Sequence, residues 1–240
     1  MSGIAVKPNS AITQFTPPPR TMPEAGGGAP YPYVGFVSNK SPNYADLITA
    51  LGGVKPEGTP YIGVNGKCQT IEPFRFFLFT SFRAWVSRDQ TNKLTGVSLT
   101  QPVGKSNLRD NVEAVIWAFH NGTIIPAVVS FRAAKTDPVV KGDEAIREAM
   151  TPGFAAKSPD HKLAMAIPQE FARVVITATH YADTSKKGFA YSGLRHAIAP
   201  TTVGDWRILE AALSNPTFIE QHQAALDEYM NRVKAIQEYK

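Results

Sequence analysis

Residues 72–88 read EPFRFFLFTSFRAWVSR and combine arginines with aromatic rings more densely than any other part of the chain. In an extended strand, side chains alternate between the two faces. The even positions from 74 to 86 are mostly apolar and predict a face that belongs to the core. The odd positions mix arginines with aromatic rings and comprise Arg75, Phe77, Phe79, Arg83 and Trp85, together with two serines.

This mixed face has the chemistry that binding of single-stranded nucleic acid requires. Bases stack on flat aromatic rings for about 1–3 kcal/mol each, whichever base is present. Arginines hold phosphates or stack on rings by cation–π contact. Two structural alternatives stay open. An appended helix could cover the odd face and leave the arginines at its rim, or part of the segment could be helical.

Further basic residues lie on strands and their loops, whereas the final helix is nearly balanced in charge. Arg173 shares one face of a predicted strand with Tyr181, and residues 88–111 are long and polar enough to form a mobile loop. Such a distribution is expected of an electrostatic groove for a polyanion. The other basic candidates are Lys67, Lys105, Arg109, Lys186, Lys187 and Arg195.

Motifs for catalysis or for metal binding are not evident. The five histidines do not show the spacing of HxH or HExxH, and a GxxxxGK[ST] phosphate loop is absent. A two-metal nuclease needs several carboxylates at one end of a sheet, but acidic residues are sparse in the predicted strands. The sequence therefore predicts a protein that is not an enzyme and that uses neither metal nor cofactor.

Composition sets the broad class of the protein. A chain of 240 residues is long enough to bury a real core, and its net charge of +5 agrees with a polyanionic partner. Cys68 is the only cysteine, so an intramolecular disulfide is excluded and a reducing compartment is the simplest setting. No secretory signal and no apolar stretch of membrane-spanning length is visible. We expect a cytoplasmic protein, in the host cytoplasm if it is viral, with no membrane partner.

Turn signals and periodicity locate the elements. Asn-Gly pairs predict hairpins within residues 61–71 and 112–132, and Pro126 predicts an edge or a bulge in the second hairpin. Short helices are expected at 41–53, 142–150 and 201–213, and Asn215 caps a long final helix. Strands at 33–37, 170–182 and 189–198 complete roughly seven strands, mostly paired in antiparallel hairpins.

These elements predict an α+β protein. Its centre is an antiparallel β-barrel, OB-like or Greek-key, with inserted helices and a C-terminal helical extension. Residues 1–32 form a flexible arm rich in proline and glycine, 33–200 the β-rich domain, and 201–240 helices that pack on the domain or on a partner subunit. The final helix carries two rows of seven-residue spacing, Ile219, Leu226 and Val233, and His222, Tyr229 and Ile236.

The chain resembles the OB-fold single-stranded-DNA-binding proteins of bacteriophage replication systems over about residues 33–200. The resemblance is carried by the hairpins YIGVNGKCQTI and VEAVIWAFHNGTIIPAVVSFR, the FRFFLF strand with its aromatic and basic face, and the late hairpin with SKKG. It implies sequence-independent binding of single strands during replication or recombination, without metal or cofactor. The chain departs from these proteins by ending in a mixed-charge helix, AIQEYK, instead of a flexible acidic tail, which puts tail-mediated recruitment in doubt.

The leading hypothesis is a non-catalytic protein that binds single-stranded DNA. In this hypothesis Arg75, Arg83, Lys186, Lys187 and Arg195 neutralise phosphates, while Phe77, Phe79 and Trp85 stack bases with support from Tyr181. The alternative is a structural or assembly protein, such as a virion component. In that case the N-terminal arm and residues 216–239 make subunit contacts and form a homo-oligomer.

Overall fold

The computed structural model describes residues 29–41, 43–89, 93–104, 106–149, 151, 163, 167–184, 188 and 190–239. Most of the expected N-terminal arm lies outside these residues, and so do Lys105, Lys186 and Lys187. The described strands are β1 (Tyr33–Phe36), β2 (Pro60–Val64), β3 (Lys67–Thr70), β4 (Phe74–Arg88), β5 (Leu94–Ser98), β6 (Arg109–His120), β7 (Thr123–Arg132), β8 (Val174–Thr184) and β9 (Ala190–Pro200). The described α-helices are α1 (Tyr44–Ala50), α2 (Asp137–Ala149), α5 (Val203–Leu213) and α6 (Pro216–Gln237), and two 3-10 turns are η1 (Ala133–Lys135) and η2 (Glu170–Arg173).

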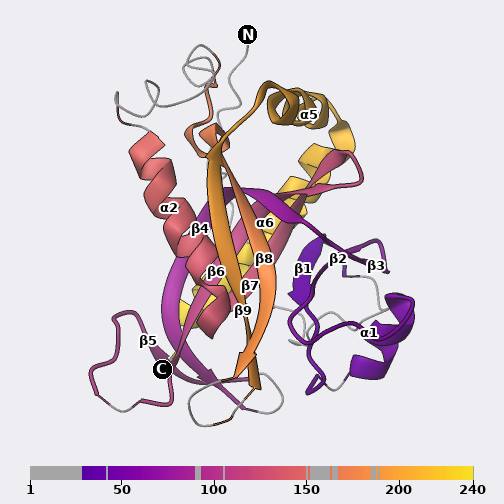
Figure 1. Cartoon of the computed structure of the whole chain (residues 1–240). Coiled ribbons are helices and arrows are strands. Elements are labelled where there is room, and N and C mark those ends of the chain that lie inside the picture. Colours follow the sequence, from indigo (N-terminus) through magenta and orange to yellow (C-terminus); the bar gives the residue numbers. More distant parts are fainter. Residues whose placement is uncertain are drawn as a thin grey trace, which may run out of the picture.

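All nine strands belong to one strongly curled sheet, which forms a half-barrel (Figure 1). The strand order is β3-β2-β1-β7-β6-β4-β8-β9, and β5 pairs with the far end of β4. The α+β class is confirmed. The sheet is mixed, however, and not wholly antiparallel, because Tyr33 and Val34 of β1 pair in parallel with Val128 and Val129 of β7.

Both hairpins that the Asn-Gly pairs predict are present. Asn65 and Asn121 have φ angles of 49°, and the glycine after each also has a positive φ. This left-handed conformation is tolerated best by asparagine and glycine, and it matches the twist of two-residue hairpins. The sequence therefore determines these two turns through local conformational preference.

Pro126 lies in β7 opposite Trp117 of β6, where β7 has no partner on its other side among the described residues. The backbone N–H of Val128 donates to the carbonyl oxygen of Pro32 on that other side. The nitrogen of Pro126, two residues earlier, points in the same direction and past the start of β1. The missing donor of proline therefore costs no ladder hydrogen bond, which agrees with the expected edge position.

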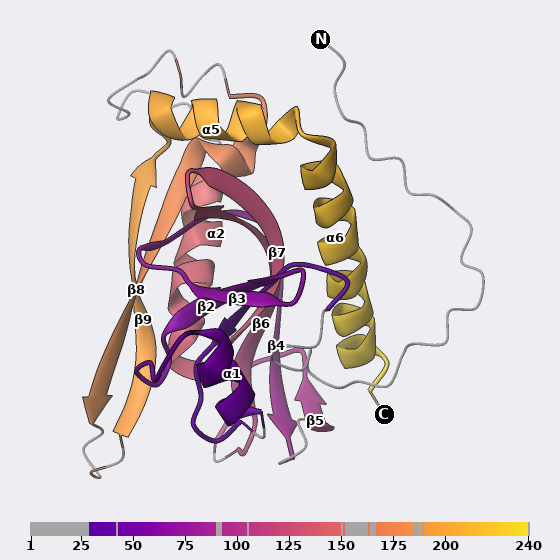
Figure 2. The ribbon, with the colours of Figure 1, turned by 90° about the vertical axis from the view of Figure 1, so that its right-hand side faces the viewer.

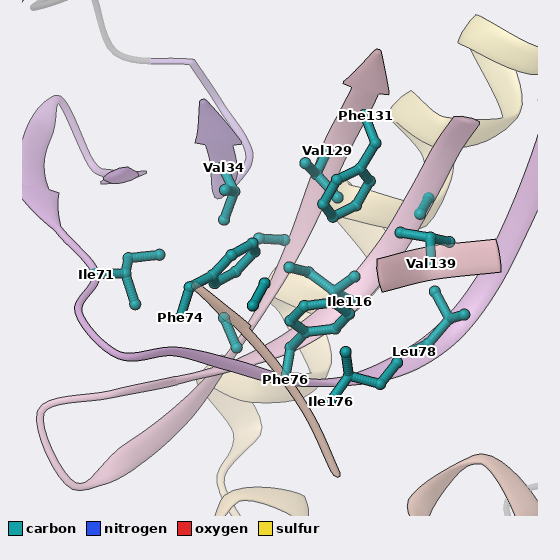
Figure 3. Close-up of a cluster of buried hydrophobic side chains, with 14 of the residues drawn as sticks. Val34, Ile71, Phe74, Phe76, Leu78, Ile116, Val129, Phe131, Val139 and Ile176 are labelled. Carbon is teal, nitrogen blue, oxygen red and sulfur yellow. The ribbon is translucent and has the colours of Figure 1, made fainter. Parts of the chain in front are cut away.

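The concave side of the sheet holds the main core, shown in Figure 3. Phe74, Phe76 and Leu78 of β4 meet Phe131 of β7 and Val139 of α2 there. Val34 and Leu194, from strands near opposite ends of the strand order, belong to the same cluster, so the curl of the sheet encloses this core.

Helix α2 packs closely against this core because it carries a glycine at its contact point. A Cβ atom on Gly142 would lie 2.2 Å from Cδ1 of Ile176 in β8. The helix predicted at 142–150 corresponds to the second part of α2, which begins earlier, at Asp137.

Helices α5 and α6 cover the convex side, opposite α2 (Figure 2). The buried residues of α6 lie three, four or seven positions apart, on one side of the helix, and are Phe218, Ala225, Tyr229, Val233 and Ile236. In the structure the C-terminal helices pack on the sheet of their own chain, which was one of the two alternatives. Ile219, the first residue of one predicted row, stays 43% exposed.

Candidate nucleic-acid interface

A β-bulge in β4 changes which side chains share a face. Leu78 pairs with Ile116 and Thr80 pairs with Val115, so Phe79 is an extra residue without a partner on β6. Such an insertion reverses the alternation of side chains beyond it. Phe76 and Leu78 therefore face the concave core, whereas Phe82, Ala84 and Val86 face α6 on the convex side. The single aromatic and basic face expected from strict alternation does not exist.

The first two candidates for base stacking lie under the helices. Phe77 is 0% exposed and packs among residues of β6, α5 and α6. The ring of Phe79 stacks on Trp117 at 5.5 Å between centroids and meets His222 edge-on at 4.6 Å. An appended helix over this face was one of the open alternatives, and the structure has it. Neither ring presents a free face to a base in this conformation.

Arg75 links β4 to the start of α5. Its guanidinium donates to Oδ1 of Asp205 at 2.8 Å and lies 4.7 Å from the centroid of the Phe119 ring. Asp205 in turn forms a capping box with Thr202, in which each residue bonds the backbone N–H of the other. The charge of Arg75 thus positions the helix that covers Phe77, instead of standing free for a phosphate.

Arg83 and Trp85 lie on the opposite side of the sheet from Arg75. Arg83 pairs with Val112, which belongs to the concave core, and cross-strand partners share a face. Both carboxylate oxygens of Asp110 accept hydrogen bonds from Arg83, at 2.9 and 2.8 Å. The guanidinium also lies 5.0 Å from the centroid of the half-exposed Trp85 ring. This pair keeps the aromatic and basic character that the sequence predicts.

The burial of His222, between its own helix α6 and the sheet, leads to a prediction about the pH dependence of stability. Its Nδ1 accepts a hydrogen bond from Nε1 of Trp117 at 3.2 Å, so Nδ1 carries no proton. Burial lowers the pKa of His222 below its usual range. The unfolded chain then takes up a proton at a higher pH than the folded chain does. Stability is therefore fully present above about pH 6.5 and falls as the pH drops below it.

We expect His222→Gln to reduce the loss of stability at low pH, by as much as about 1.4 kcal/mol per pH unit for one titrating proton. The measurement is urea denaturation between pH 7.5 and 5.5. The pKa of His120 is also lowered by burial, so His120→Gln serves as a comparison and its effect should add to that of His222→Gln. An unchanged pH dependence in His222→Gln would contradict the assignment.

The ribbon of β8 and β9 carries the exposed face that β4 lacks. Beyond its contact with β4 at Phe74–Phe76, β8 pairs only with β9 among the described residues. On the convex side, Thr179 lies opposite Arg195, Tyr181 opposite Gly193, and Asp183 opposite Tyr191. We call these six residues the ribbon face. Its exposed groups include Arg195, Tyr191 and the oppositely charged Asp183.

The rings of the ribbon face have defined positions. A Cβ atom on Gly193 would lie 2.5 Å from the hydroxyl oxygen of Tyr181, so this tyrosine lies across the glycine. The Arg195 guanidinium is 5.1 Å from the centroid of the Tyr181 ring, and Tyr191 meets that ring edge-on at 6.2 Å. The hydroxyl of Tyr191 donates to Asp183. The result is an ordered row of tyrosine, tyrosine and arginine on an uncovered strand pair.

The remaining candidates do not form one site. Arg173 belongs to η2, not to a strand, and its guanidinium donates to the carbonyl oxygens of Ala149 and Ile167. Lys67 begins β3, at the other end of the strand order from the ribbon. Arg109 begins β6, and the predicted loop at 88–111 contains strand β5. Lys105, Lys186 and Lys187 lie outside the described residues.

Sequence reasoning missed Tyr191 and two further arginines, Arg88 and Arg132. Tyr191 could have been found, because strict alternation in residues 189–198 places it with Arg195. The two arginines lie on different strands, and only the pairing of β4, β6 and β7 brings them to one pocket.

The part of the chain that the structure describes holds no group of three His, Cys, Asp or Glu side chains placed to bind a metal ion. None of the described helices is both long enough and apolar enough to cross a membrane. No protein-family model, no curated protein and no solved structure matches the chain.

Proposed function

We propose that this protein binds single-stranded DNA without sequence preference, through the ribbon face. The observation that carries the proposal is the row formed by the exposed Tyr191 and Arg195 and the half-buried Tyr181 between them. Bases stack on tyrosine rings and on the planes of guanidinium groups, and neither surface selects a particular base. Lys186 and Lys187 follow in the segment between β8 and β9 and add positive charge to the same part of the sequence.

Support also comes from the contrast between the two sides of the sheet. Helices cover the rings of β4 on the convex side, but the same side of β8 and β9 stays exposed at Thr179, Arg195 and Ala197. A core has no need of a tyrosine and arginine stack at that place, and an exposed cluster of this kind is typical of binding surfaces. The OB-like interpretation of the curled sheet and a role in replication or recombination are parts of the same proposal.

The test is a titration of the full chain with labelled oligo-dT at two salt concentrations. We expect Tyr181→Ala to weaken binding about 5- to 150-fold, which corresponds to the loss of one stacked base. Arg195→Gln should weaken binding and reduce the slope of log K against log salt by about 0.7, as expected for one lost phosphate contact on a single strand.

Two control variants make the test specific. Tyr181→Phe keeps the ring and should bind as the wild type does. Arg147→Gln removes the same charge from an exposed site on α2, where Asp143 is its partner, and should leave the salt slope unchanged. Equal binding by Tyr181→Ala and wild type would refute the ribbon face. A stable oligomer that forms without DNA and binds no strand would favour the assembly function instead.

A further inference from the structure

A pocket of about 350 Å³ opens where the ends of three neighbouring strands and strand β5 meet. Its volume lies at the lower end of the usual range for small-ligand sites, about 300–1,000 Å³. The side chains around it are almost all polar or charged, and they are Val86, Ser87, Arg88, Thr95, Asn107, Arg109, Asp110 and Arg132. Three of the eight are arginines, from β4, β6 and β7.

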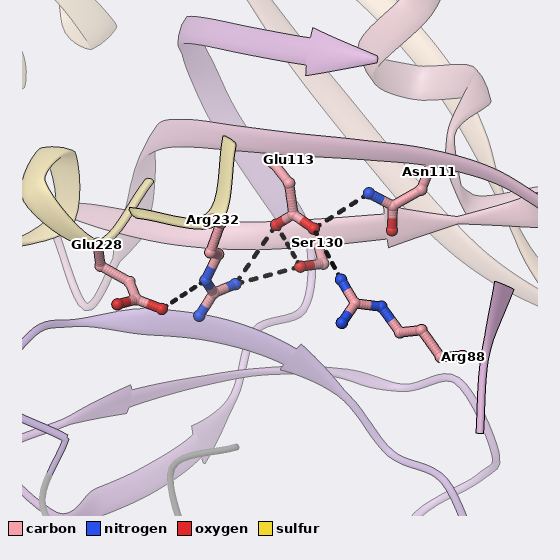
Figure 4. Close-up of polar contacts among 6 residues, drawn as sticks. All are labelled: Arg88, Asn111, Glu113, Ser130, Glu228 and Arg232. Carbon is pink, nitrogen blue, oxygen red and sulfur yellow. Dashed lines mark hydrogen bonds and ion pairs between the residues drawn. The ribbon is translucent and has the colours of Figure 1, made fainter. Parts of the chain in front are cut away.

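Arg88, which lines this pocket, also faces a buried carboxylate, Glu113, which is 1% exposed (Figure 4). Arg88 lies 4.0 Å and Arg232 of α6 lies 3.5 Å from its oxygens. Asn111 and Ser130 donate hydrogen bonds to it. Burial alone would raise the pKa of Glu113, but Arg232, these two hydrogen bonds and Arg132 lower it. Glu113 is thus a fixed negative charge that holds arginines together.

The positive charge at this place exceeds the negative charge. The arginines are Arg83, Arg88, Arg109, Arg132 and Arg232, and the carboxylates are Asp110, Glu113 and Glu228. Asp89 and Lys93, in the turn after β4, carry one charge of each sign and do not change this balance. The formal charges of the five arginines and three carboxylates therefore sum to +2, an excess of two positive charges. Asp110 does not compensate them, because Arg83 and Thr136 occupy both of its oxygens.

An excess of buried or half-buried cations is costly unless an anion accompanies it. Burial lowers the pKa of Arg132, and the nearby Arg232 lowers it further, although Glu113 acts in the opposite direction. A bound dianion would reduce this repulsion. Guanidinium groups bind phosphate oxygens through paired hydrogen bonds. The hydroxyl of Ser87, which accepts a hydrogen bond from Thr95, and the amide of Asn107 line the same pocket and can complete the set of donors.

We infer that this pocket binds a phosphate group, either free or carried by a nucleotide or polynucleotide, among the guanidinium groups of Arg88, Arg109 and Arg132. A tetrahedral dianion accepts hydrogen bonds in several planes, which suits arginines that arrive from three strands. The inference does not rest on the ribbon face. The tip of the β8–β9 ribbon and the end of β4 do lie at the same end of the molecule in Figures 1 and 2, so one strand of DNA could reach both.

The test measures the binding of three probes to the full chain by isothermal titration calorimetry at constant ionic strength. The probes are inorganic pyrophosphate, oligo-dT with a 5′-phosphate, and the same oligonucleotide without it. Arg109→Gln is the test variant, because Arg109 is exposed at the start of β6 and its loss should not disturb folding. Arg147→Gln, on α2, is the matched control.

We expect Arg109→Gln to weaken the binding of at least one probe about tenfold or more, as expected for the loss of a charge-assisted hydrogen bond. Arg147→Gln should not. The probe whose binding weakens identifies the source of the phosphate. A response of pyrophosphate indicates a free anion, and a response of the 5′-phosphorylated strand alone indicates a terminal phosphate. A response of both strands indicates an internal phosphate. The inference fails if Arg109→Gln changes none of them, or if acetate at equal ionic strength competes as well as pyrophosphate.

The two proposals can fail separately. Tyr181→Ala should weaken the binding of oligo-dT but leave the binding of pyrophosphate unchanged, because the ring is not part of the pocket. If pyrophosphate binds and oligo-dT does not, the phosphate pocket is supported and DNA binding by the ribbon face is refuted. If pyrophosphate does not bind the wild type, and both forms of oligo-dT bind Arg109→Gln as tightly as the wild type, the ribbon face is supported and the pocket is refuted.

Discussion

Replacing Glu113 with glutamine should lower the free energy of unfolding by about 3–5 kcal/mol, the usual effect of breaking a buried charge pair. The carboxylate is 1% exposed, and arginines from β4, β7 and α6 surround it. Glutamine keeps the size of the side chain but removes its charge. The guanidinium of Arg232 would then remain largely buried with only Glu228 to balance it.

Urea denaturation at neutral pH measures this effect. Glu144→Gln on α2 is the control, because its carboxylate is exposed and pairs with Lys141 only at the surface. It should leave the unfolding midpoint unchanged. A midpoint for Glu113→Gln that equals that of Glu144→Gln would show that the network does not stabilise the fold.

Glu113 also leads to a prediction for the free energy of unfolding at acid pH. The pKa of Glu113 is lower in the folded chain than in the unfolded chain, because its arginine and hydrogen-bonding neighbours outweigh burial. The unfolded chain therefore binds a proton first as the pH falls. The contribution of Glu113 is fully present above about pH 4.5 and is lost as the pH falls through its folded pKa. Glu113→Gln should flatten this part of the curve.

Replacing Phe77 with alanine should also destabilise the protein, by about 3–5 kcal/mol, as for other buried phenylalanines. The ring is 0% exposed and lies among side chains of β6, α5 and α6, so its removal leaves a cavity that rigid neighbours cannot fill. This outcome separates a core role from the base-stacking role that alternation predicts for this position. A stacking residue would lose affinity for DNA and little stability.

The measurement combines thermal or urea unfolding with the oligo-dT titration. Phe77→Ala should unfold earlier, while the fraction that stays folded binds oligo-dT with wild-type affinity. Trp85→Ala is the comparison, because that ring is half-exposed and its loss should cost less stability. Weaker DNA binding by Phe77→Ala at unchanged stability would show instead that Phe77 stacks on a base.

Local signals in the sequence determined the turns, the caps and most of the elements. Asn65 and Asn121 with their following glycines set the hairpins, and Asn215 with Pro216 starts α6, because these residues act on their own backbone. Strand β5 and the first part of α2 were missed, since pairing with β4 and packing on β8 and β9 stabilise them more than local preference does.

The ribbon face was partly predictable for the same reason. Tyr181 and Arg195 were identified because two regular strands joined by a short turn place alternate residues on one side. The candidates on β4 were not placed correctly, because alternation holds only while the ladder is regular. One extra residue at Phe79 sends Arg75 and Arg83 to opposite sides of the sheet.

The sequence by itself thus determined most of the strands and helices, and which residue types are available to bind a polyanion. Only the tertiary structure decided which of them remain accessible. The bulge, the curl of the sheet and the packing of α5 and α6 depend on contacts between residues far apart in the chain. These contacts bury Phe77, engage Arg75 with Asp205, and bring Arg88, Arg109 and Arg132 to one pocket. Burial is a property of the assembled fold, and a single strand read in isolation does not contain it.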